Sequence, residues 1–157
     1  MFSLPPIDGT EEGCTDENPI HLSGVTSQDF ERLLSLFYPQ NVIDGDLSTV
    51  DEWTSVLALA TRWDFAGHRD LAIARLAQLA SPVDRILLAR KYVVEAWLGP
   101  AYLALCKRDE ALTMEEGERL GMKDVIMLSD IRQAIRGNYR VTMHERNIIA
   151  LIDKQLT

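Results

Sequence analysis

Apolar residues recur every three or four positions along most of this chain, the spacing of helices that bury one face. The clearest stretch runs over residues 51–65 and carries Trp53 and Trp63 at apolar positions of that pattern. Just upstream, Thr49 and Glu52 have the spacing of a capping box, in which each residue's side chain bonds to the other's backbone at a helix start. The pattern predicts a central helix with both Trp side chains in the core of a helical domain.

The same reasoning predicts about eight helices in total. They are expected at residues 26–38, 51–63, 67–79, 82–92, 95–107, 113–121, 122–136 and 142–156. Thr26 and Ser81 can cap two of them, and Thr113 with Glu116 forms a second capping box. Thr142 forms a third, with Glu145. Because Pro100 lies early in the fifth segment, that helix is expected to begin a little after residue 95.

One short strand is predicted at the N-terminal side of the first helix. Residues 18–22 alternate between polar and apolar, so Ile20 and Leu22 are expected to face the core. The preceding residues 1–18 are rich in Pro, Gly, Asp and Glu, a composition typical of a flexible acidic arm. The fold class predicted from the pattern is mainly α, a multi-helix domain with one short N-terminal strand.

The apolar face of each predicted helix supplies candidates for the structural core. Large side chains at inward positions are expected to carry most of the buried area. They are Phe30, Leu33, Leu34, Trp53, Leu57, Trp63, Phe65, Tyr92, Trp97 and Tyr102.

The net charge of the chain indicates which classes of binding partner are disfavoured. The 157 residues carry a net charge of −8, which disfavours nucleic acid and anionic membrane surfaces as partners. The sequence has no apolar run of the length of a membrane span. Two cysteines without metal spacing, Cys14 and Cys106, are typical of free thiols in a reducing compartment, so we expect a cytoplasmic or nuclear protein.

The search for catalytic chemistry predicts no enzyme, no cofactor and no metal site. His21, His68 and His144 share no ligand spacing with one another or with cysteines and acids. Cys106 lies beside Lys107 and Arg108, whose charges would lower the pKa of its thiol, but no base is placed to activate it. Most acidic residues are accounted for by helix caps and solvated faces.

Several segments resemble fungal BTB/POZ domain proteins, in which the last part of the BTB fold is followed by a BACK-like helical extension. The matching segments lie at residues 16–22, 30–39, 52–65, 82–92 and 97–102. The resemblance spans residues 16–136, about three quarters of the chain. It implies a truncated BTB/POZ-like part at residues 19–80, without the front half of that domain, and a C-terminal helical extension at residues 81–157.

The resemblance also implies a function. BTB/POZ proteins associate with other proteins, often as homodimers, and some act as scaffolds or as adaptors of cullin ubiquitin ligases. We therefore expect a non-catalytic protein–protein interaction module whose partners are other proteins, including a second copy of itself. The alternative is a small regulatory helical protein that binds a ligand in a pocket near Trp63 and Trp97.

Overall fold

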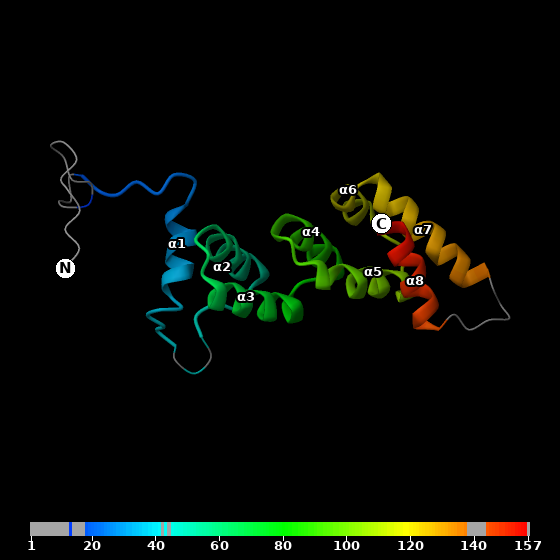
Figure 1. Cartoon of the computed structure of the whole chain (residues 1–157), viewed down its shortest axis with the longest axis horizontal. Helices are drawn as coiled ribbons and strands as arrows, with labels where there is room; N and C mark the ends of the chain where they lie inside the picture. The colour runs from blue at the N-terminus through cyan, green and yellow to red at the C-terminus, as the bar shows by residue number, and fades with distance from the viewer. Residues whose placement is uncertain (1–12, 14–17, 42, 44, 138–143, 157) are drawn as a thin grey trace.

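The computed structural model describes residues 13, 18–41, 43, 45–137 and 144–156, and its regular structure is helical (Figure 1). The elements are α1 (Ser27–Leu34), α2 (Val50–Arg62), α3 (Ala66–Leu79), α4 (Pro82–Tyr92), the 3₁₀ helix η1 (Glu95–Trp97), α5 (Leu98–Lys107), α6 (Met114–Leu120), α7 (Met122–Gly137) and α8 (Glu145–Leu156). The prediction of a mainly helical protein is confirmed.

Two helix starts are fixed by the capping boxes that the sequence predicted. The Thr49 side chain accepts from the Glu52 N–H, and the Glu52 carboxylate accepts from the Thr49 N–H at 2.9 Å. Thr113 and Glu116 make the same pair of bonds at the start of α6. Both boxes satisfy N–H groups that the first turn of a helix leaves without a partner. The third predicted cap, Thr142, lies outside the described residues.

The first helix begins as predicted but ends earlier. Thr26 accepts from the Asp29 N–H and starts α1, which stops at Leu34 instead of at Tyr38. Ser35 follows the last helical residue, and its hydroxyl donates to the Arg32 carbonyl at 2.8 Å. A serine that bonds to the preceding turn competes with helix continuation, and the chain proceeds as turns.

The predicted strand is wrong. Asn18 makes only an isolated bridge, and residues 19–22 have no regular structure. Ile20 and Leu22, which were expected to face the core, are 63% and 42% exposed. A strand needs a neighbour with which to exchange backbone bonds, and the described residues contain no second strand. Pro19 also lacks the N–H that a ladder requires.

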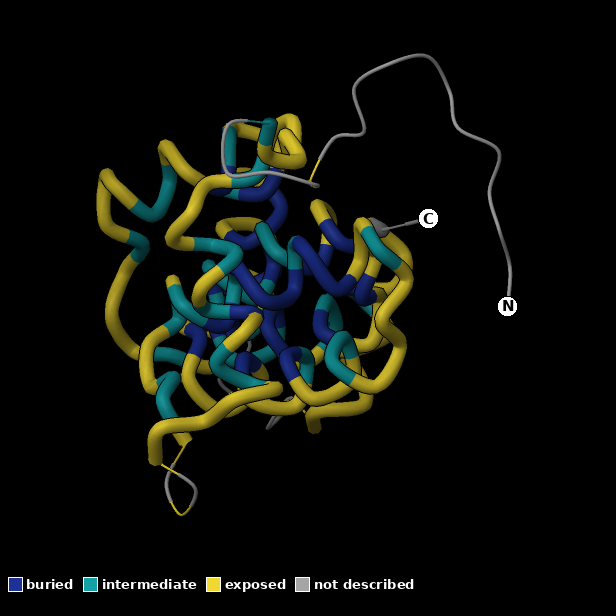
Figure 2. Tube along the Cα trace, turned by 90° about the vertical axis from the view of Figure 1, so that its left-hand side faces the viewer, coloured by how far each residue is buried: buried dark blue, intermediate teal, exposed yellow. Residues whose placement is uncertain are grey.

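Two hydrophobic clusters hold the helices together, and α4 contributes to both. The first cluster contains Leu33, Trp53, Val56, Leu57, Leu59, Ala72, Leu76, Ala89, Tyr92, Val94 and Trp97. The second contains Val83, Ile86, Ala101, Tyr102, Leu105, Cys106, Leu120, Met127, Leu128, Ile131, Ile148 and Ile152. Figure 2 shows these buried positions gathered inside an exposed outer surface. The two clusters therefore meet within α4.

Backbone geometry ends α4 abruptly and redirects the chain into η1 and α5. Val93 has a positive φ of 54°, and the following Val94 N–H donates to the Ala89 carbonyl at 2.9 Å. A left-handed residue followed by an N–H that bonds to the carbonyl five residues earlier is a common way for a helix to end. Glycine usually occupies the left-handed position. The segment predicted as one helix from Glu95 is divided into η1 and α5, and Pro100 occupies the first turn of α5, where its missing N–H costs nothing.

A buried polar cluster joins α4, α5 and α7. Asp124, whose side chain is 3% exposed, accepts from Arg90 at 2.6 and 2.8 Å and from the Tyr102 hydroxyl at 2.9 Å. Arg90 also donates to the Tyr102 oxygen at 2.8 Å. Hydrogen bonding to Asp124 raises the pKa of Arg90, and burial raises the pKa of Tyr102.

Within the described part of the chain, every helix is too short or too polar to span a bilayer.

Candidate protein-interaction surface

Aromatic and apolar side chains gather on one exposed surface formed by α1, the turn after it, the end of α2 and the start of α3. We call this surface the aromatic face. It consists of Phe30, Leu34, Phe37, Trp63, Phe65 and His68. Figure 1 shows these helices together at the N-terminal end of the molecule.

Polar contacts between α1 and α2 set the orientation of α1. Arg32 donates to the Ser55 hydroxyl at 2.7 Å and pairs with Asp51 at 2.7 Å. The Ser55 hydroxyl donates to Asp29 at 2.5 Å, and this bond lowers the pKa of the Asp29 carboxyl. Leu33, 2% exposed, packs in the first cluster. These contacts fix α1 against α2.

A left-handed residue at the end of α2 places Phe65 on the aromatic face. Asp64 has a φ of 57°, and the Phe65 N–H donates to the Ala60 carbonyl at 2.9 Å. Aspartate tolerates this region better than most residues because its short polar side chain can bond locally. The turn brings Phe65 beside Trp63, with ring centroids 6.1 Å apart.

The rings form a connected series of contacts. Phe30 meets Trp63 edge to face, with centroids 6.1 Å apart and an interplanar angle of 86°. Phe37 contacts Phe65 at 6.4 Å and lies 4.6 Å from the His68 ring. Such geometries are favourable for aromatic pairs, so the contacts stabilise this arrangement of the rings. The aromatic face is therefore a connected surface.

This surface is open to solvent. Leu34, Phe37 and Phe65 are 37%, 48% and 39% exposed, and no other element of the described chain covers them. Arg62 donates to the carbonyls of Ser23 and Gly24, at 2.8 and 3.3 Å, and so holds the exposed apolar segment 20–22 near the end of α2. A connected apolar surface that stays uncovered is typical of an interaction site.

The ten predicted core residues fall into three groups. Six are buried, two are half-buried and two are exposed. The buried residues are Leu33, Trp53, Leu57, Tyr92, Trp97 and Tyr102; Phe30 and Trp63 are half-buried; Leu34 and Phe65 are exposed. The expectation of a core position is corrected for Leu34 and Phe65, because both lie on the aromatic face. Periodicity identifies an apolar position but does not tell whether another element covers it.

The sequence did not single out Phe37 and His68 as members of one surface. Phe37 lies within the helix predicted at residues 26–38, and from the sequence His68 was weighed only as a metal ligand. The turns after residue 34 carry Phe37 toward the start of α3, where it meets His68. No spacing rule in the sequence links two residues that a turn brings together.

The structure also locates the candidates for other chemistry. Burial raises the pKa of the Cys106 thiol to about 11, which corrects the expectation that Lys107 and Arg108 lower it. Lys107 pairs instead with Glu145, and Arg108 pairs with Glu116 at 2.7 Å. Among the described residues, no three His, Cys, Asp or Glu side chains gather as a metal site.

The alternative function requires a ligand pocket near Trp63 and Trp97, and both side chains lie at the first hydrophobic cluster. Trp97 is 7% exposed and belongs to that cluster, and Trp63 packs against it. Hollows of the described chain lie along α6 and α7 and at the start of α8, and neither Trp lines these hollows.

Comparisons with family models, with curated proteins and with solved structures each returned no match to this chain.

Proposed function

We propose that this chain is a non-catalytic protein–protein interaction module, and that its aromatic face is the surface that binds the partner. The observation that carries this proposal is the exposure of Phe37 and Phe65, which belong to one connected series of ring contacts, together with the exposure of Leu34 on α1. Aromatic side chains contribute much of the binding energy of protein interfaces because they bury a large area at a small loss of conformational entropy.

The construction of this surface supports a binding role over a structural one. Phe37 and Phe65 leave large parts of their rings in water, so they contribute less to folding than fully buried rings would. Their positions are nevertheless held by ring contacts and by the turn at Asp64. A preformed apolar surface binds with a smaller ordering cost than a mobile one.

The type of module that we propose follows from the resemblance to fungal BTB/POZ proteins. On that basis the chain is a scaffold or adaptor in the cytoplasm or nucleus, with other proteins as its partners. The aromatic face lies in residues 19–80, the part that resembles the end of the BTB fold.

Affinity purification with the full chain, followed by measurement of the affinity for a recovered partner, tests the proposal. The double variant Phe37→Ala/Phe65→Ala is expected to bind that partner at least tenfold more weakly, because each ring is a candidate hot spot. The matched control is Ile43→Ala, which removes a 93% exposed apolar side chain outside the aromatic face and should bind normally. Equal affinity of the double variant and the control would contradict the proposal.

A further inference from the structure

A groove runs along α6 and α7, at the end of the molecule opposite the aromatic face (Figure 1). It consists of two adjoining hollows of about 430 and 410 Å³, which share Leu112 and Val125 as lining residues. We call it the α6/α7 groove. Met114 and Met122 line its mainly apolar end together with the acid Glu118, and Arg132 and Arg136 line its basic end.

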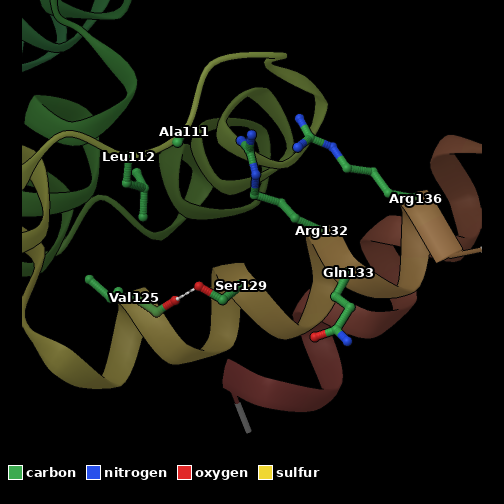
Figure 3. A pocket seen from close by; sticks show the side chains of 7 residues that line it. All are labelled: Ala111, Leu112, Val125, Ser129, Arg132, Gln133 and Arg136. Carbon is green, nitrogen blue, oxygen red and sulfur yellow. Dashed lines mark hydrogen bonds between the residues drawn. The ribbon is translucent and has the colours of Figure 1, made fainter.

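The basic end of the groove contains two guanidiniums, those of Arg132 and Arg136. Arg132, 8% exposed, donates to the backbone carbonyls of Leu105 at 2.5 Å and Glu110 at 2.8 Å. Arg136 donates to the Asp109 carbonyl at 2.7 Å. In the described part of the chain, neither guanidinium forms an ion pair. Figure 3 shows both side chains pointing toward the segment that contains Ala111.

The contacts of these two arginines hold the guanidiniums in place without cancelling their charge. A carbonyl oxygen accepts a hydrogen bond but contributes no full negative charge, so both residues remain cationic beside the groove. Each guanidinium has five N–H donors in a fixed geometry, and the carbonyls of the loop occupy only some of them. The basic end is therefore suited to a carboxylate.

The apolar end offers flexible and exposed side chains. Met114 is 81% exposed, Met122 is 73% exposed, and Ile126 beside them is 55% exposed. Methionine adapts its shape to the surface that it contacts, which is why it is common at peptide-binding sites. From Met122 to Arg136 the helix rises about 21 Å, so an apolar site and a cationic site lie in line along one helix.

The chain itself contains a segment with the complementary pattern. Residues 1–18 begin with apolar side chains and continue with acidic ones, without any Lys or Arg. The apolar members include Phe2, Leu4 and Ile7, and the acidic members are Asp8, Glu11, Glu12, Asp16 and Glu17. Ile7 and Glu12 are five residues apart, which corresponds to about 17 Å of extended chain. That span is of the same order as the rise of about 21 Å between Met122 and Arg136 along α7.

We propose that the α6/α7 groove binds the acidic segment, residues 1–18, of a second copy of this chain. The apolar side chains of the segment would contact Leu112, Val125 and Met122, and its carboxylates would bond to Arg136 and approach Arg132. The segment precedes α1, which lies at the far end of the molecule from α7 (Figure 1). The acidic segment of a neighbouring copy can reach the groove without folding back along the helices of its own copy. Such a contact is head-to-tail, because it joins different surfaces of the two copies.

Binding of a synthetic peptide of residues 1–18 to the full chain is the first measurement. Fluorescence anisotropy should show saturable binding that weakens as salt increases, because the contact is partly ionic. Arg136→Gln should weaken it about tenfold, the effect of losing one charge-assisted bond. Lys123→Gln is the matched control: it removes the same charge from an exposed position of α7 outside the groove and should change the affinity less than twofold. A peptide with its five acids replaced by amides should bind at least tenfold more weakly.

Sedimentation of the full chain over a range of concentrations is the second measurement. We expect self-association that Arg136→Gln and added peptide weaken and that Lys123→Gln leaves unchanged. Absence of peptide binding would overturn the proposal, as would a chain that remains monomeric although the peptide binds. Association that depends on Phe37 and Phe65 but not on Arg136 would also overturn it, and would assign self-association to the aromatic face. The proposed function does not depend on these results, because it rests on different residues.

Discussion

Replacing Asp124 by asparagine should strongly destabilise the protein. The carboxylate is buried at the start of α7, where the positive end of the helix dipole also favours its charge. It accepts two bonds from Arg90 and one from Tyr102. Asparagine keeps the shape of the side chain, but it loses the charge and turns an NH₂ group toward the guanidinium, donor against donor.

The size of the effect follows from the exposure of the partners. Bonds to a charged group contribute about 1.5–3 kcal/mol each, and a buried partner left without its bond pays the full cost of desolvation. Water can compensate Arg90, whose side chain is 43% exposed, whereas Tyr102 is fully buried. We therefore expect Asp124→Asn to lower the free energy of unfolding by about 2–3 kcal/mol, less than the 3–5 kcal/mol typical of breaking a fully buried ion pair.

Urea unfolding followed by circular dichroism measures this change. A loss of that size should lower the midpoint by about 1–2 M with an unchanged slope. Asp130→Asn is the matched control, because Asp130 is an exposed acid on the same helix, and it should change stability by less than about 0.5 kcal/mol. If Asp124→Asn costs less than about 1 kcal/mol, the cluster does not hold α4 and α7 together. A double-mutant cycle with Arg90→Met should give a coupling of about 1–3 kcal/mol.

Three further predictions concern single side chains. Trp53→Ala should cost about 3–5 kcal/mol in urea unfolding, since Trp53 is 5% exposed; a cost below about 1 kcal/mol would contradict its core position. Val93→Gly should raise the free energy of unfolding by about 0.5–1 kcal/mol, because glycine removes the strain of a positive φ and this gain exceeds the entropy cost of glycine. Val93 is 72% exposed, so little packing is lost. A net loss of stability would show that Val93 is not strained. The Arg108 guanidinium and the Thr113 N–H lower the pKa of Glu116 from 4.5 to about 2. The ionised carboxylate therefore stabilises the folded state above pH 4.5 and loses this effect as the pH falls toward 2. In urea unfolding at a series of pH values, the stability advantage of the wild-type chain over Glu116→Gln should shrink over that range. A constant difference in stability would argue against the ion pair.

Features that depend on a few adjacent residues could be predicted from the sequence. The capping box of Thr49 and Glu52 is one such feature, because its bonds join residues three positions apart. The predicted strand failed because a strand depends on a partner that can lie anywhere in the chain. Residues 19–22 have the alternation of a strand but no neighbouring strand among the described residues, and backbone bonding cannot be inferred from alternation alone.

The exposure of the candidate site also depends on contacts between residues that are distant in the sequence. Periodicity indicated that Leu34 and Phe65 are apolar positions, but their exposure depends on which helices cover them. The polar cluster around Asp124 was not predicted at all. An acid in the first turn of a helix usually lies on the surface, and nothing near Asp124 in the sequence indicates that Arg90 and Tyr102 enclose it.

The division of α4 between the two clusters has a consequence for how the chain unfolds. Ala89 and Tyr92 belong to the first cluster, while Val83 and Ile86, on the same 11-residue helix, belong to the second. If either cluster opened alone, α4 would lose one half of its packing, and a helix of this length is marginal in water without packing. The melting of one cluster therefore removes a structural support of the other. The described helices should behave as one cooperative unit, with calorimetric and van't Hoff enthalpies that agree.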